Sequence, residues 1–305
     1  MYAYLLLLFV LINVSNSFIF QNSKRHLGFE TKLSKQVLTL SASASGASDT
    51  FKNQPSVQLI GDNNTVKKTP DFLAALSYFG ATAVEFTLIN VFLHIIQISA
   101  KKLSIKYPEL FLSASASIAI KIGLGLFFFF LSVRSRVFSP LDNSRPSASK
   151  QDPNFKRKTP KWMPPPLAFP IIWSSIALLR SISSVLIVTH TKTLLSPAIF
   201  AFMLHLSVGD TWNCINNYEK RLGTAVLGVI AVWASVIYAV KQYYMTYPLA
   251  GKLLSPSAVW ITIATFLVTT IWRLNYSEMG QPALFPSKEE GPSCKWRWPL
   301  TSWNS

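Results

Sequence analysis

The sequence has little of what most enzymes and disulfide-stabilised domains require. Only two of its 305 residues are cysteines, Cys214 and Cys294, and Cys214 falls within an apolar stretch. This supports neither a disulfide framework nor a cysteine-based zinc site. The chain has no HExxH motif, nucleophile elbow, P-loop or dinucleotide-binding glycine motif. These absences argue against the enzyme classes that such motifs mark, and no obligatory cofactor is predicted.

Charged residues are also scarce, at 14% of the chain, while half of the residues are hydrophobic. The mean hydropathy of +0.31 exceeds what a soluble core of this size needs. Between residues 72 and 275, mostly apolar runs recur that are long enough, at about 20 residues, to cross the hydrocarbon layer of a bilayer. We therefore predict an all-helical integral membrane protein whose first partner is the lipid bilayer.

The net charge of +16 comes from 29 basic residues against 13 acidic ones. Such an excess can signal nucleic-acid binding, but here no basic stripe is interleaved with aromatic residues as in the known binding modules. The basic residues lie mainly between the apolar runs, which is the positive-inside pattern of membrane proteins. Nucleic acid is therefore not a predicted partner. The densest group consists of Lys150, Lys156, Arg157, Lys158 and Lys161.

The N-terminal 70 residues resemble a targeting region. Residues 1–17 combine an apolar run with a small polar end, as in a signal peptide, and residues 18–50 are rich in serine and basic residues, as in a transit peptide. Residues 51–70 read as a linker. A signal peptide followed by a transit peptide favours a plastid membrane reached through the secretory pathway. The alternative is a secretory-pathway membrane protein with an unstructured lumenal tail.

The apolar runs predict one additional hydrophobic helix and then a bundle of five. The additional helix covers residues 71–100 and is interrupted by Glu85 and His94, so it either spans the membrane or lies at its interface. The bundle extends over residues 110–275, and residues 276–305 form a C-terminal tail. Its five helices are predicted at 110–133, 167–189, 196–218, 222–246 and 252–274.

One bundle helix carries a polar face that lipid would not tolerate. Six polar or small residues fall within an arc of about 140° at 100° per residue, and ionisable groups within a membrane normally face a partner or a wet cavity. Arg180 on the preceding helix is the candidate partner of Asp210. We weigh a buried pair that only fixes helix packing against the polar end of a ligand pocket. The six residues are His205, Gly209, Asp210, Asn213, Asn216 and Asn217.

Three groups of tryptophan, proline and basic residues resemble the tryptophan-rich sensory protein and translocator protein family. The first is Pro160-Lys-Trp162-Met-Pro164-Pro165 with Phe169-Pro170 and Trp173. The second is Trp212 with Lys220-Arg221 and Gly223. The third is Pro248-Leu-Ala-Gly251, Leu253-Leu254, Pro256, Trp260, Ala264 and Trp272-Arg-Leu-Asn275.

The resemblance implies a five-helix bundle, dimeric in many members, that binds a tetrapyrrole such as porphyrin or haem, or a similar planar apolar molecule. Indoles can stack on such a ring and donate to it, although interfacial tryptophans form belts for other reasons. The polar contacts depart from the family, since Ser257 replaces a tyrosine, while Val268 and Gly209 replace asparagines. The predicted ligand-binding residues are Trp162, Trp173, Arg180, His205, Asp210, Trp212, Asn213 and Trp260.

Four functions remain open at this point. Ligand binding, with a role in sensing, sequestration or trafficking, is the reading that the indoles favour. A transporter of a tetrapyrrole or small solute would use the charged face of the third bundle helix, but no inverted repeat is apparent. An enzyme that degrades porphyrin oxidatively lacks a cofactor motif. An assembly partner in a membrane complex would bind no ligand at all.

Overall fold

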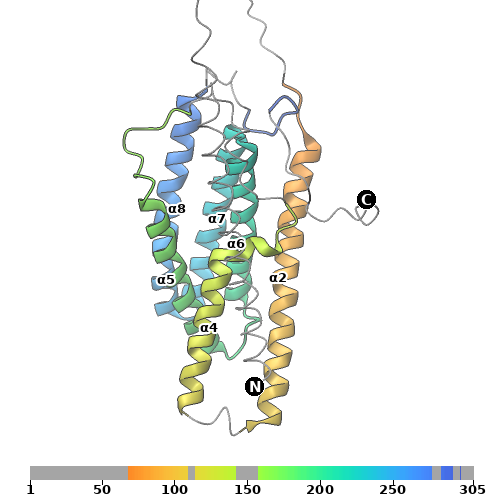
Figure 1. Cartoon of the computed structure of the whole chain (residues 1–305), viewed down its shortest axis with the longest axis vertical. Coiled ribbons are helices and arrows are strands. Elements are labelled where there is room, and N and C mark those ends of the chain that lie inside the picture. The colour runs from red at the N-terminus through yellow and green to blue at the C-terminus, as the bar shows by residue number, and fades with distance from the viewer. Residues whose placement is uncertain (1–67, 109–113, 142–156, 277–282, 291–295, 297–305) are drawn as a thin grey trace, which may run out of the picture. The chain divides into compact units, whose positions relative to one another are not determined.

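The computed structural model describes residues 68–108, 114–141, 157–276, 283–290 and 296 (Figure 1). The predicted signal peptide (1–17) and transit peptide (18–50) lie outside the described residues, as does the predicted linker up to residue 67. The described part has no β-strand and is built from long helices, which confirms the predicted all-α class. These helices are α2 (Phe72–Lys106), α4 (Ala114–Arg134), α5 (Ala168–Thr191), α6 (Pro197–Asn213), α7 (Leu222–Thr246) and α8 (Pro248–Leu274).

Five of the described helices are long and apolar enough to cross a membrane: α2, α4, α5, α7 and α8. Helix α6 is shorter at 17 residues and continues as a π-helical segment, η3 (Cys214–Glu219). It packs between α2 and α7. The protein is therefore an integral membrane protein with the predicted five-helix bundle, α4 to α8, and one additional hydrophobic helix, α2.

The helices begin and end where local chemistry dictates. Ser196 caps α6 by accepting a hydrogen bond from the Ile199 amide at 3.4 Å, and proline follows it at the first helical position, where no backbone donor is needed. Lys192 and Lys220 adopt the left-handed conformation, each with a φ of 57°, and terminate α5 and η3 in the manner of C-terminal caps.

Helix α2 runs beside the bundle and contacts it along one seam (Figure 1). The buried residues recur every three or four positions, as expected for a helix with one packed face. The remaining surface is exposed and apolar, with Leu73, Leu76, Phe79 and Val91 among the exposed side chains, as suits contact with lipid. The seam consists of Ala74, Tyr78, Ala81, Glu85, Ile89 and Leu93.

The turn between α6 and α7 is more buried than its sequence suggests. A run of three charged residues at a helix junction predicts a solvated turn, but Glu219 and Arg221 are buried and only Lys220 is exposed. The left-handed conformation of Lys220 reverses the chain there, so its two neighbours point towards α2, where Tyr78 donates to the Glu219 carboxylate. Cys214, at the start of η3, is buried and disulfide-bonded. This corrects the sequence-based inference that the two cysteines do not support a disulfide.

Candidate functional site

A cavity of about 700 Å³ lies within the bundle. Its walls come mainly from α5, α6 and α8, and η1 (Ser135–Phe138) and residues 157–170 contribute further lining residues. This volume is typical of small-molecule sites. The aromatic, apolar and polar lining residues include Phe169, Trp173, Trp212, Trp260, Ile261 and Val268, with Arg136, Arg157, Arg180, His205, Asp210 and Asn213.

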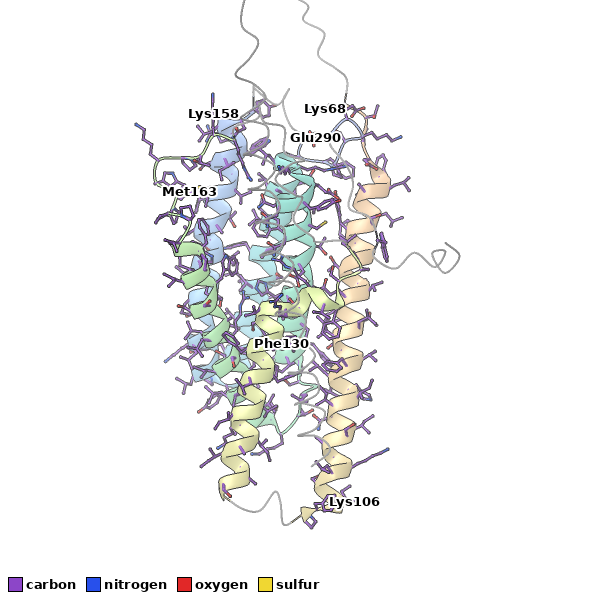
Figure 2. The ribbon with its side chains drawn as sticks, in the orientation of Figure 1. Lys68, Lys106, Phe130, Lys158, Met163 and Glu290 are labelled. Atoms are coloured by element: carbon purple, nitrogen blue, oxygen red, sulfur yellow. The ribbon has the colours of Figure 1, made fainter. Side chains whose placement is uncertain are left out.

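Seven of the eight residues predicted to bind a ligand line this cavity. The exception is Trp162, which is 51% exposed and lies next to the lining residue Met163, labelled in Figure 2. Trp173 is 37% exposed, whereas Trp212 and Trp260 are buried. The structure therefore brings three of the predicted indoles around one space, and the role of each in ligand binding remains a prediction.

The two buried indoles are held differently. Trp212 donates its Nε1–H to the carbonyl oxygen of Ala225 at 3.0 Å, and its ring lies so close to Gly228 that a Cβ there would come within 2.9 Å of it. Trp260 packs edge-on against Phe169 with ring centroids 6.1 Å apart. Its buried Nε1–H has no partner among the described residues. Trp212 is thus fixed by the protein, whereas Trp260 retains a donor for a ligand.

Arg180 and His205 form a buried pair at the polar part of the cavity. Ser235 donates to the Val232 carbonyl at 2.7 Å, so its oxygen accepts from His205 Nδ1 at 3.0 Å. The Nε2 atom of His205 is then the acceptor for Arg180, at 2.7 Å. Both ring nitrogens are engaged, which leaves His205 without a free lone pair for a metal. The Arg180 Nε–H has no partner among the described residues.

Arg180 and Asp210 line the same cavity and interact electrostatically, but the described residues show no direct hydrogen bond between them. Asp210 accepts hydrogen bonds from Ser135 and from the Nε of Arg136, the latter at 3.3 Å. Both donors belong to η1, which follows α4 directly and turns towards α6. Residues 134–161 are a basic connection between two apolar runs, a pattern that indicates solvated charge, so their position at the cavity was not predicted.

Asparagines extend the polar wall towards residue 157. Asn217 donates to Asn213 at 3.1 Å, Asn216 donates to Asn217 at 3.0 Å, and Arg157 donates to Asn216 at 3.4 Å. Burial lowers the pKa of Arg157, and its Nε–H has no partner among the described residues. Arg157 also lines the cavity. The sequence placed these asparagines on one polar helix face, but it assigned Arg157 only to the basic group between two apolar runs.

Comparison with known proteins places this architecture in a family. The TspO/MBR family model matches residues 124–273. Protein CrtK of Rhodobacter capsulatus is 30% identical over 125 residues, which cover 40% of this chain and 77% of that protein. The chain belongs to the TspO/MBR family.

Two further relatives are more distant from this TspO/MBR protein. The tryptophan-rich sensory protein of Cereibacter sphaeroides is 28% identical over 118 residues, 39% of this chain and 73% of that protein. The translocator protein of Homo sapiens is 23% identical over 124 residues, 40% and 73% respectively. The match to the family model extends from within α4 to near the end of α8. Helix α2 therefore lies outside the part of this TspO/MBR chain that the family model describes.

Helix α2 adds a buried carboxyl group behind the cavity wall. Glu85 is fully buried and lies beside Asp210 and Arg136. No hydrogen bond of normal geometry joins its carboxyl oxygens to the described residues, although Ser139 and Asp210 lie within interaction range, and no residue of α2 lines the cavity. In the sequence, Glu85 stands out only as an interruption of an apolar run. That interruption was the available signal, because a carboxylate at membrane depth is costly without a specific neighbour.

The described residues contain no cluster of three His, Cys, Asp or Glu side chains that could hold a metal ion. The candidate site consists of an aromatic, apolar chamber with polar groups concentrated along α6. Such a site can enclose a flat apolar body and offer hydrogen bonds to acceptor groups on that body.

Proposed function

We propose that this TspO/MBR protein captures a planar, carboxylate-bearing ligand of the tetrapyrrole class in the cavity between α5, α6 and α8. The observation that carries the proposal is a set of three buried N–H groups without partners, on residues that all line the cavity. They belong to Arg157, Arg180 and Trp260. A buried donor left unpaired costs free energy, about 1–3 kcal/mol each, so a ligand with acceptor groups would bind where the protein leaves donors open.

The apolar lining supports the planar part of this ligand. Phe169, Trp173 and Trp260 offer aromatic faces or edges, which suit a conjugated ring. Arg180 faces the ligand with a guanidinium that His205 orients through the 2.7 Å hydrogen bond. A guanidinium pairs well with a carboxylate. Because both nitrogens of His205 are engaged, the ring binds through its edge groups and its faces, without a histidine bond to a central metal.

A direct test compares protoporphyrin with its dimethyl ester on the purified full-length protein, by following the shift in porphyrin absorption during titration. The Arg180→Met variant should bind protoporphyrin at least tenfold more weakly, because a charged hydrogen bond contributes about 1.5–3 kcal/mol. The same variant should bind the ester no more weakly than the wild type does. Equal loss for both ligands would show that Arg180 only maintains the fold.

A second pair of variants tests the indole donor. Trp260→Phe should weaken porphyrin binding without lowering the melting temperature. Trp233→Phe is the matched control, since Trp233 bonds to Thr262 at 2.9 Å and does not line the cavity. If Trp260→Phe leaves the porphyrin affinity unchanged, or if Trp233→Phe reduces it to the same extent, the proposed role of Trp260 in ligand binding is contradicted.

The role proposed for this binding is sensing or sequestration in a plastid membrane. One relative bears the name tryptophan-rich sensory protein, and the composition of residues 1–50 is that of a signal peptide followed by a transit peptide. A fluorescent protein fused behind residues 1–70 should enter the plastids of a cell with plastids of secondary origin. Retention of the fusion in the secretory pathway would contradict the plastid location and leave the binding proposal intact.

A further inference from the structure

A second hollow lies between α7 and α8, close to the turn that joins them. Its volume is about 430 Å³, and it shares no lining residue with the ligand cavity. Most of its side chains are apolar, but two lysines border it. The lining residues are Ile237, Val240, Lys241, Tyr244, Met245, Gly251, Lys252 and Ser255; we refer to this hollow as the α7–α8 crevice.

The crevice follows from helix geometry. Its five α7 residues, 237, 240, 241, 244 and 245, recur at the spacing of a single helix face. That face continues to the lipid-exposed surface, since Ile237, Tyr244 and Met245 are exposed. Gly251 of α8 meets α7 so closely that a Cβ would lie 2.5 Å from the Cα of Tyr244. This contact closes one end of an apolar groove that is open to the bilayer.

Both lysines lie close enough to a helix end to reach the lipid headgroup region. Lys241 is five residues before the end of α7, and Lys252 is the fifth residue of α8, so each backbone lies about 6–8 Å from its helix end at 1.5 Å per residue. A lysine side chain can span that depth and place its ammonium group at the interface. Both lysines are exposed. No acidic residue lines the crevice.

The surrounding end of the molecule is basic. Helices α2 and α7 begin at the same end, where Tyr78 contacts Glu219, and so Lys101, Lys102 and Lys106 of α2 lie at the end where α7 meets α8. Figure 2 shows Lys106 at this end and Lys68 and Glu290 at the other. The acidic residues among those described lie elsewhere in the chain: Asp71, Glu85, Asp210, Glu219, Glu289 and Glu290.

We propose that the α7–α8 crevice binds an anionic phospholipid. One acyl chain lies along Ile237, Val240 and Met245, and the phosphodiester lies between Lys241 and Lys252. Basic pockets between membrane helices attract anionic headgroups in this way. A zwitterionic lipid would bring a second cation to a crevice whose lining residues carry only positive charges, and an uncharged sterol would leave both ammonium groups without a counterion.

The test uses full-length protein in mild detergent, titrated with phosphatidylglycerol, phosphatidylcholine or inorganic phosphate, with bound lipid counted by native mass spectrometry. Phosphatidylglycerol should bind at least tenfold more tightly than phosphatidylcholine, and phosphate should not displace it at millimolar concentration. The double variant Lys241→Gln/Lys252→Gln should lose this preference. The control Lys101→Gln/Lys102→Gln makes the same charge change at the same end and should keep it.

A third variant addresses the groove itself. Ser255→Phe fills the crevice without changing any charge and should reduce phosphatidylglycerol retention, while circular dichroism and porphyrin binding verify that the variant is folded. Three results would overturn the proposal: equal loss in both double variants, displacement by free phosphate, or full retention in Ser255→Phe. The first would indicate diffuse attraction to a basic end, the second a free-anion site, and the third binding outside the groove.

Discussion

Helices α6 and α2 both carry polar residues at membrane depth, but those residues serve different surroundings. In α6, His205, Asp210 and Asn213 line the cavity. In α2, Tyr78 and Glu85 are buried against the bundle, and neither lines the cavity. A polar residue in an apolar helix therefore indicates a buried neighbour. Whether that neighbour belongs to a packing contact or to a binding site depends on whether there is space between the helices.

The attachment of α2 is strongest near its N-terminal end. The buried Arg221 contacts Glu219 at 3.2 Å and Asp71 at 3.6 Å. Residues 283–290 of the tail complete this attachment, because the Asp71 amide donates to Pro286 at 2.7 Å and Lys68 pairs with Glu290 at 3.1 Å. If α2 is chiefly a packing element and α6 a binding element, mutations in the two contacts will have separable effects.

The largest effect is expected for Arg221→Met. The side chains of Arg221 and Glu219 are 1% and 0% exposed, and removal of one partner of a buried ion pair typically costs about 3–5 kcal/mol. The free energy of unfolding in detergent should fall by that order, measured by chemical denaturation. Lys220→Met, at the exposed neighbouring position, should have little effect. A similar loss in both variants would show that the turn, and not the buried charge, matters.

A smaller effect of opposite sign is expected for Glu85→Gln. The Glu85 carboxyl lies beside the acidic group of Asp210, and no hydrogen bond of normal geometry joins its oxygens to the described residues. A glutamine of the same shape supplies an amide that can donate to Asp210, so the protein should become more stable by about 1 kcal/mol. Porphyrin affinity should stay unchanged. A variant that is stable but no longer binds porphyrin would assign Glu85 to the site and contradict the separation of α2 from α6.

The sequence was sufficient for the helices and for most of the cavity wall. Apolar runs and proline positions located α5, α7 and α8 because these features act locally along the chain. The indoles at 173, 212 and 260 were recognisable because few side chains of that size fit within a helical bundle without defining its interior. Periodicity likewise placed His205 and Asp210 on one face of α6.

The interactions that the sequence did not predict are made by residues in the connections between helices, where the chain changes direction. Arg136 follows a helix end in sequence, and only the 3₁₀ turn of η1 carries it to Asp210. Arg221 looks equivalent to Lys220 in sequence, yet the left-handed Lys220 places them on opposite sides of the chain. In the sequence, a charged residue in a short connection looks the same whether it is buried or exposed to solvent. No local pattern shows which connection packs against the bundle.

The smallest expected effect concerns pH at the tail contact of α2. Glu289 accepts hydrogen bonds from the Thr69 hydroxyl at 2.6 Å and from its amide, and these hydrogen bonds lower the pKa of Glu289. A carboxylate with a lowered pKa stabilises the folded contact above its ordinary pKa of about 4.3, and this contribution is lost as pH falls through the lower, folded value. Amide exchange at Thr69, corrected for the intrinsic rate, should therefore be slow at pH 6 and faster at pH 3. In Glu289→Gln the corrected rate should not change between these pH values, whereas the exchange of α6 should be the same in both proteins. A pH-dependent change in α6 that depends on Glu289 would mean that the tail contact reaches the cavity wall, and would join the two regions that the structure separates.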